Sequence, residues 1–254
     1  MLSVHVSLTN LRIVLVRPRY SGNVGAVARA MRNMGMNDLA LVNPSRLCRN
    51  TADTMAVHAR DVLDTMQVQC SLRAAVADCG LVVGTTCRPG LYRDGALTPR
   101  TLAPHILAAA AANRVALVFG PEDSGLSNED LRLCHRLVTI PTDPAYTSLN
   151  LAQAALLCCY EVFVAQEEAP APPRPLAIAE RQELMYEKLK GALLKIGFLH
   201  GDNPDHVMFA LRRILGRAGL EDRDVRILLG MARQMEWYAG GGWRPYSGGG
   251  ENPQ

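Results

Sequence analysis

The sequence predicts an α/β fold with a mainly parallel sheet, followed by a small all-helical extension. Short apolar runs rich in β-branched residues alternate with helical patterns over the first part of the chain, and a Pro-rich stretch separates them from a wholly helical remainder. This alternation is typical of parallel sheets, because each parallel pair needs a crossover connection. The 254 residues, 48% hydrophobic and 20% charged, have the composition of a globular protein that can bury a core.

Five short apolar segments are predicted to be buried strands, because each is a continuous run without the spacing of an amphipathic helix. They lie at residues 11–16, 38–42, 81–85, 115–119 and 137–140. A long apolar helix from about Leu149 to Val164 is expected to close this unit.

The segments between the strands carry helix start and stop signals. Helical spacing over 23–34 is followed by Gly35, which favours a helix end at that point. Ser71 is predicted to cap a further helix, and Ser127 with Asp130 fits a capping box.

A Pro-rich segment marks the predicted domain boundary. The prolines at 170, 172, 173 and 175 exclude a helix or a central strand, so an extended linker is expected there. The predicted division is a domain over 1–166, a linker over 167–178, a helical extension over 179–239 and a disordered tail over 240–254.

Three helices are expected in the extension. The first covers 179–196 and ends at Gly197, and the second begins with Asn203 as cap and Pro204 at its first position. The third runs from about Asp222 to Tyr238.

Cysteine spacing and charge limit the possible functions. The seven cysteines form no CxxC or Cys/His spacing, so we expect reduced thiols in the core and no metal site. No run of eighteen uncharged apolar residues and no signal peptide is visible, which predicts a soluble cytoplasmic protein. The net charge of +3 permits an RNA partner without requiring one, although arginines gather locally near both ends of the chain.

The first candidate site segment is the strand-to-helix junction VRPRYSGNVGAVARAMRNMG at 16–35. Gly22 and Gly25 are expected to let the backbone approach a ligand. The segment has no GxGxxG or GKS/T motif, which argues against dinucleotide and triphosphate binding. Asn23 and Arg29 are expected to border one site at the strand ends; the alternatives are a helix cap and a solvated charge.

Two further candidate segments follow predicted strands. LVFGPEDSGLSNEDL at 117–131 places Gly120 and Glu122 beyond a strand end, where ligands bind in open α/β sheets. TIPTDPAYTSLNLAQAALL at 139–157 places Thr147, Ser148 and Asn150 at a helix start. An acidic turn and ordinary helix caps are the alternative explanations.

In this order and spacing, the three segments resemble the three motifs of the SPOUT superfamily of RNA methyltransferases, in its TrmH-like (SpoU) 2′-O-methyltransferase branch. The resemblance covers residues 11–165, and LRRILGRAGLEDRDVRILLGMARQ resembles the C-terminal extension of a tRNA-modifying subgroup. It implies a C-terminal trefoil knot, which general topology rules treat as a rare exception. It also implies S-adenosylmethionine as cofactor and a homodimer with its site at the subunit interface. In such a dimer the apolar helix at 149–164 pairs with its copy in the partner subunit; the alternative is that this helix only completes the core.

The resemblance further implies residue roles. Cofactor contacts are expected from Thr85, Thr86, Cys87, Gly120, Ile140, Thr147, Ser148 and Leu149. The catalytic set is Asn23, Arg29, Glu122, Ser148 and Asn150. RNA contacts are expected from Arg17, Arg19, Arg29, Arg212 and Arg213; the alternative for the extension is a solvated helix face with pairs to Glu221 and Asp222. A guanidinium is a poor base, so Arg29 is expected to grip a phosphate and stabilise the developing alkoxide.

The reaction implied is S-adenosylmethionine-dependent methylation of a ribose 2′-hydroxyl of tRNA, with the cytidine or uridine at nucleotide 32 of the anticodon loop as the leading target. Ribosomal RNA methylation is the alternative within the same class. A non-catalytic RNA-binding protein that kept the fold is the alternative of another class.

Overall fold

The computed structural model describes residues 8–87, 95–168, 175–200 and 204–242. Within them, a six-stranded, all-parallel sheet has the order β3-β2-β1-β5-β4-β6. The strands are β1 (Leu11–Val16), β2 (Asp38–Val42), β3 (Gln67–Gln69), β4 (Cys79–Thr85), β5 (Arg114–Phe119) and β6 (Arg136–Val138). The predicted parallel sheet is confirmed. Strand β3 was not predicted, because its QVQ sequence is exposed and has no apolar run.

Some helices of this unit follow the predicted signals, whereas those at 49–56, 60–65 and 99–110 were not predicted. The helices are α1 (Ser21–Asn33), α2 (Arg49–Ala56), α3 (Arg60–Thr65), α4 (Leu72–Val76), α5 (Pro99–Ala110), α6 (Asn128–Arg132) and α7 (Leu151–Val164), with 3-10 turns η1 (Leu8–Asn10) and η3 (Ala165–Glu168). Gly35 lies beyond α1 with φ of +72°. The cap at Ser71 and the capping box of Ser127 with Asp130 are confirmed.

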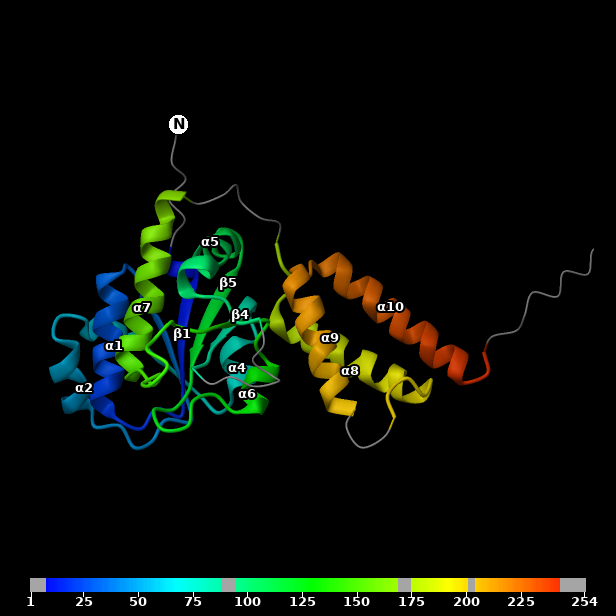
Figure 1. Cartoon of the computed structure of the whole chain (residues 1–254), viewed down its shortest axis with the longest axis horizontal. Helices are drawn as coiled ribbons and strands as arrows, with labels where there is room; N and C mark the ends of the chain where they lie inside the picture. Colours follow the sequence, from blue (N-terminus) through cyan, green and yellow to red (C-terminus); the bar gives the residue numbers. More distant parts are fainter. Residues whose placement is uncertain (1–7, 88–94, 169–174, 201–203, 243–254) are drawn as a thin grey trace, which may run out of the picture.

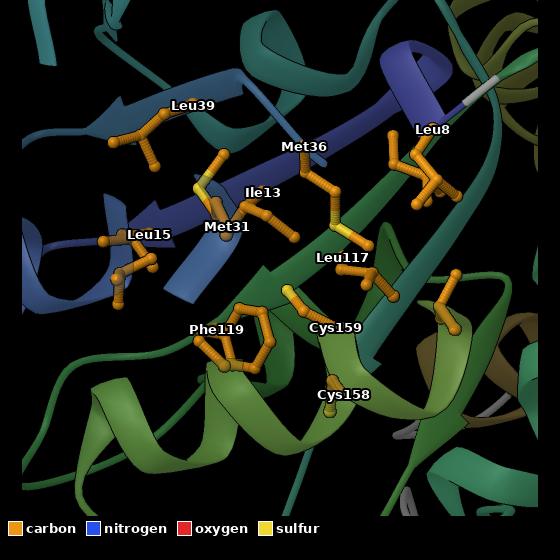
Figure 2. Close-up of a cluster of buried hydrophobic side chains, with 14 of the residues drawn as sticks. Leu8, Ile13, Leu15, Met31, Met36, Leu39, Leu117, Phe119, Cys158 and Cys159 are labelled. Atoms are coloured by element: carbon orange, nitrogen blue, oxygen red, sulfur yellow. The ribbon is translucent and has the colours of Figure 1, made fainter. Parts of the chain in front are cut away.

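Helices cover both faces of the sheet (Figure 1). Side chains alternate along each strand, so Ile13 and Leu15 of β1 pack with α1, α5 and α7, whereas Val14 packs with α4 and α6 on the other face. Figure 2 shows the first of these clusters, in which Phe119 of β5 lies against Cys159 of α7.

The cysteines are all free, but only some are core thiols. Cys79, Cys134, Cys158 and Cys159 are buried, as predicted. Cys48, Cys70 and Cys87 are exposed, and for these the prediction is wrong. The reason is that each of the three lies in a connection just before a helix or just after a strand, not inside an element.

Gly25 admits a neighbouring helix and not a ligand, so the prediction for this glycine is wrong, whereas that for Gly22 stays a prediction. Helices α1 and α2 are in close backbone contact at Gly25. A Cβ atom there would lie 2.0 Å from the carbonyl oxygen of Ala52 in α2, so only glycine fits. Gly22 faces the side chains of Met55 and Thr51 on the same helix.

The extension is helical, as predicted. It consists of α8 (Ala179–Lys195), α9 (Pro204–Ala218) and α10 (Asp222–Ala239), which share a core built around Met185, Tyr186 and Val225. Gly197 follows α8 with φ of +75°. The predicted cap at Asn203, the linker prolines at 170, 172 and 173, and the tail from 243 onward lie outside the described residues. No helix in the described ranges has the length and apolar character needed to cross a bilayer.

The extension packs against the β6 side of the sheet (Figure 1). Helix α8 contacts β4 and α4, and α9 contacts β6. The backbone N–H of Leu176 donates to Asn113 Oδ1 at 2.7 Å, and that of Ala177 donates to Leu220 at 2.8 Å. The end of the predicted linker is therefore fixed to both units.

Strand β6 runs between the two ends of a loop. Its residue Val138 accepts a hydrogen bond from Thr86 N, Leu97 N donates to Leu137, and Thr139 N donates to Leu97. The predicted strand over 137–140 is shorter than expected because Thr139 leaves the ladder with β4. Residues 88–94 of the loop are outside the described ranges, so the trefoil knot stays a prediction.

We predict that Gly25→Ala destabilises the protein by about 2 to 3 kcal/mol, because a methyl group has no room against Ala52. Gly230→Ala in α10 is the matched control, since a Cβ there meets no atom within 4 Å. It should stabilise by about 0.5 to 1 kcal/mol. Urea unfolding at one protein concentration measures both; equal effects would contradict the helix contact.

His135 gives a prediction for pH dependence. Its Nδ1 accepts a hydrogen bond from Val82 N at 3.2 Å, and burial, followed by the charges of Arg212 and Arg136, lowers its pKa to about 4. Because this folded pKa lies below the unfolded value of about 6.5, the unfolded chain binds the proton more readily below that pH. The contribution of neutral His135 is fully present above pH 6.5 and is lost as the pH falls toward 4.

The free energy of unfolding that is lost when His135 is protonated should reach at most about 3 kcal/mol. Unfolding of the wild type and of His135→Asn, which keeps an acceptor, should be compared at several pH values. The difference between their free energies of unfolding should shrink from pH 7 to pH 4. A constant difference would show that His135 is not held neutral.

Candidate functional site

A cleft lies at the carboxyl ends of β4, β5 and β6, beside the start of α7. Its volume, including the open mouth, is about 800 Å³. The predicted cofactor residues all line it: Thr85, Thr86, Cys87, Gly120, Ile140, Thr147, Ser148 and Leu149. The end of β4, the turn after β5 and the stretch from β6 to the start of α7 therefore meet where parallel α/β folds bind their ligands. The first candidate segment, 16–35, contributes no lining residue.

One wall of the cleft is the turn that follows β5. Gly125 N donates to the carbonyl of Pro121 at 2.9 Å, and Gly125 has φ of +66°. A Cβ atom on Gly120 would lie 2.2 Å from the Gly125 backbone, so only glycine allows the turn to fold back so closely. The whole turn from Gly120 to Leu126 lines the cleft, beyond the two positions predicted from the sequence.

The lining favours an uncharged or positively charged ligand. It consists mainly of apolar side chains, hydroxyl groups and backbone, and its charged side chains are those of Glu122 and Asp123. No Lys or Arg that the structure describes lines it, so the cleft lacks the cations that bind a polyphosphate. Among the described residues, no three His, Cys, Asp or Glu side chains come together as metal ligands.

Glu122 joins the turn after β5 to the start of α1. One carboxylate oxygen accepts from Arg19 N at 3.0 Å, and the other accepts from Tyr20 N at 3.3 Å and from Asn23 Nδ2 at 2.9 Å. Asn23 is therefore not the helix cap that was considered as an alternative: α1 begins at Ser21, two residues earlier.

Asn150 extends this network to α7. As N-cap residue, its Oδ1 accepts from Ala152 N at 2.8 Å, and its Nδ2 donates to Asn23 Oδ1 at 3.1 Å. Asn150 therefore caps α7, as the alternative explanation had it, and its role in the site stays a prediction. The linked side chains of Glu122, Asn23 and Asn150 are called the amide network below. Ser148 lines the cleft beside it.

Arg29 lies away from the cleft of its own chain. It is exposed on α1, six residues or about 9 Å of helix rise beyond Asn23, and is not among the lining residues. Within the described residues it has no hydrogen bond or ion pair with another side chain. The expectation that Asn23 and Arg29 border one mouth is therefore not met within a single chain.

The other arginines predicted to bind RNA have partners. Arg17, which has φ of +50°, pairs with the buried Asp130, and Arg19 pairs with Asp123 at 2.8 Å. Arg212 lies 4.3 Å from the ring centroid of Tyr186 and donates from Nη2 to a carboxylate oxygen of α8 at 2.9 Å.

These contacts revise two expectations for the extension. The carboxylate bound by Arg212 is that of Glu183, and the arginine side chain is only 17% exposed, so Arg212 holds α9 to α8 and is a poor candidate for RNA binding. The alternative explanation, a solvated helix face with pairs along one helix to Glu221 and Asp222, is wrong for Asp222, because its partner is Arg181 of another helix, α8, at 2.6 Å. Arg213 lies over the backbone of Gly95.

We predict that Glu122→Gln loosens the start of α1, because an amide has one acceptor oxygen for three donors. The free energy of unfolding should fall by about 1 to 3 kcal/mol, and the amide protons of Arg19 and Tyr20 should exchange faster. Asp123→Asn is the control, because its ion pair with Arg19 is exposed and should change stability by less than about 1 kcal/mol. Unchanged exchange in Glu122→Gln would contradict the network.

Comparisons with known proteins agree with this geometry. Residues 10–160 match the SpoU rRNA Methylase family, and residues 180–244 match the C-terminal domain of tRNA methyltransferase TrmJ. The tRNA (cytidine/uridine-2'-O-)-methyltransferase TrmJ of Salmonella typhimurium is 40% identical over 236 residues, which cover 90% of this chain and 97% of that protein.

Solved structures are similar as well. The crystal structure of TrmJ from Z. mobilis ZM4 has a TM-score of 0.76 and 33% identity, and the match covers 89% of this chain and 98% of that one. A methylase family protein from Neisseria gonorrhoeae has a TM-score of 0.65 and 35% identity, covering 71% and 94%. The chain therefore belongs to the SpoU methylase family, with a C-terminal domain of the TrmJ type.

Proposed function

We propose that this chain transfers a methyl group from S-adenosylmethionine to a ribose 2′-hydroxyl of tRNA, at the cytidine or uridine of nucleotide 32, and that it acts as a cytoplasmic homodimer. The observation that carries this proposal is the cleft. Three separate segments supply its lining, and the amide network ties the start of α1 and the start of α7 to its wall.

The cleft suits S-adenosylmethionine in the chemistry of its lining, which is mostly apolar side chains, hydroxyl groups and backbone. Backbone and apolar groups around Gly120 and Ile140 fit an adenine ring, and the hydroxyl of Thr147 and the backbone of Leu149 offer hydrogen bonds to a ribose. Glu122 and Asp123 provide the negative charge that a sulfonium favours. The bound cofactor supplies an electrophilic methyl group.

The amide network has a positioning role in this proposal. Asn23 is held from both sides, by Glu122 at 2.9 Å and by Asn150 at 3.1 Å, so its place at the edge of the cleft does not depend on substrate. Fixed polar groups of this kind lower a barrier because they need no reorganisation during the reaction.

We assign Arg29 to a second subunit's site. It does not line the cleft of its own chain. Helix α7 lies beside α1 (Figure 1), and several of its apolar side chains are exposed. These are Leu156, Leu157, Tyr160, Phe163 and Val164, each 39% to 47% exposed. Pairing of this surface with a second copy would bury it. Arg29 of the partner subunit would then grip the phosphate beside the target ribose and stabilise the alkoxide.

The relatives support tRNA as the substrate. The TrmJ proteins, which match 90% of this chain, are named for cytidine and uridine 2'-O-methylation of tRNA. The extension, which matches the TrmJ C-terminal domain, adds a surface beyond the methylase unit. Ribosomal RNA is the alternative acceptor that the family's description suggests.

Methyl transfer from labelled S-adenosylmethionine to purified tRNA tests the function. We expect methylation at nucleotide 32, and a loss of about 10²-fold or more in rate for Arg29→Ala. Arg32→Ala is the control: it removes the same charge from α1 but breaks only an exposed pair with Asp61 at 3.2 Å. Transfer to ribosomal RNA and not to tRNA, or an unchanged rate in Arg29→Ala, would contradict the proposal.

Mixed dimers test the assignment of Arg29 to the second subunit. One chain carries Arg29→Ala, and the other carries Ile140→Trp, which fills its own cleft. If Arg29 acts across the interface, the mixed dimer contains one complete site and recovers activity that neither parent dimer has. If the mixture stays inactive, Arg29 acts in its own chain.

A further inference from the structure

A second cavity lies where the extension meets the sheet. It is formed by the start of β6, helix α6 and helix α9, and its volume with the open mouth is about 680 Å³. Its lining residues are Gly95, Leu97, Leu131, Cys134, His135, Arg136, Leu137, Phe209, Arg213 and Arg217. Neither the methylase unit nor the extension could form it alone.

The charges that line this cavity are all positive. Arg136, Arg213 and Arg217 contribute guanidinium groups, and no Asp or Glu of the described chain is among the lining residues. Arg212 differs from Arg136 and Arg217 because Glu183 neutralises it. Within the described part of the chain, Arg136 and Arg217 have no ion pair with a carboxylate, and such guanidinium groups attract an anion.

The pKa values of two groups reflect this positive potential. The pKa of Arg136 is lowered by burial and then by the charge of Arg217. The pKa of His135 is lowered to about 4 by burial and then by the charges of Arg212 and Arg136. In both cases the neighbouring charges are positive. An anion bound in the cavity would reduce the repulsion between these positive groups.

Hydrogen-bond donors are available as well as charge. Arg136 donates from Nη2 to the carbonyl oxygen of Arg217 at 2.9 Å, which uses one of the five N–H groups of a guanidinium. His135 accepts from Val82 N at Nδ1, so its neutral ring carries the proton on Nε2 and is a donor. Guanidinium forks match the geometry of phosphate oxygens.

We infer that this cavity binds a phosphodiester group of the RNA substrate through Arg136 and Arg217. This inference rests on the proposed function, which supplies a polyanionic ligand. The cavity and the cofactor cleft share the segment around β6: Arg136 lines one, and Ile140 lines the other. Ile140 lies four residues after Arg136, and four residues of extended chain span at most about 14 Å. The cavity and the cleft are therefore close enough for one RNA to contact both. The junction between the two units is thus a surface that binds RNA.

Filter binding of tRNA to the full-length protein tests this inference. We expect the double variant Arg136→Gln and Arg217→Gln to bind tRNA about fivefold to tenfold more weakly near 0.1 M salt. The slope of log affinity against log salt concentration should fall by about one for each phosphate that the variant no longer neutralises. Arg217→Lys should retain most of the affinity, because it keeps the charge.

Arg226→Gln is the matched control, since it removes an exposed charge from α10 that does not line the cavity. S-adenosylmethionine binding by calorimetry should be unchanged in the variants, and thermal unfolding shows that each is folded at the assay temperature, which separates RNA binding from folding. The Arg136 side chain donates a hydrogen bond to the backbone carbonyl of Arg217, and the double variant loses it. The single variant Arg217→Gln keeps this hydrogen bond, so it keeps the test valid if the double variant is unstable.

The outcomes separate the two proposals. If the wild type neither binds nor methylates tRNA, the proposed function fails. If the wild type does both, and the double variant binds like Arg226→Gln with the same salt slope, the cavity does not bind RNA. Stabilisation of the wild type by inorganic phosphate, absent in the double variant while tRNA binding is unchanged, would instead identify a site for a free anion and overturn the RNA assignment.

Discussion

The carboxylate of Glu122 is the group on which the rest of the candidate site depends. It accepts hydrogen bonds from the backbone of Arg19 and Tyr20 and from the amide of Asn23, which in turn accepts from Asn150. A parallel sheet brings the ends of its strands to one edge, but it does not fix the angle at which helices leave that edge. The network does so, because it joins groups about a hundred residues apart across the starts of α1 and α7.

The amino ends and the carboxyl ends of the strands, here called the first and the second edge of the sheet, have different roles. At the strand starts, Arg12 is 3% exposed and is held between Asp38 at 3.1 Å and Asp78 at 2.8 Å, where it secures β1 and β2 to the connection before β4. At the strand ends, polar side chains line an open cleft. Burial of a charge is tolerated at the first edge because the charge is paired. The second edge remains available to a ligand and, with the positively charged cavity at β6, to a polyanion.

Much of the fold followed from the sequence because its signals are local. Strands β1, β2 and β5 are continuous apolar runs, and Ser127 with Asp130 sets the start of α6 within four residues. The cleft was predictable in part: most of its residues lie at the end of β4 or in the second and third candidate segments, and none comes from the first segment at 16–35. Contacts between distant residues were not predictable. Nothing near Gly25 in the sequence indicates Ala52, and nothing near Arg212 indicates Glu183; both depend on how helices pack. The cavity of Arg136 and Arg217 escaped prediction because it belongs to neither unit alone.

The central claim is that the three segments form a ribose methylation site for tRNA. Mass-spectrometric mapping of 2′-O-methyl groups in RNA from cells with and without this protein tests it most directly. The methyl group at nucleotide 32 of tRNA should disappear when the protein is absent and return when the wild-type chain, but not Arg29→Ala, is restored. An unchanged pattern in tRNA, or a loss confined to ribosomal RNA, would contradict the account.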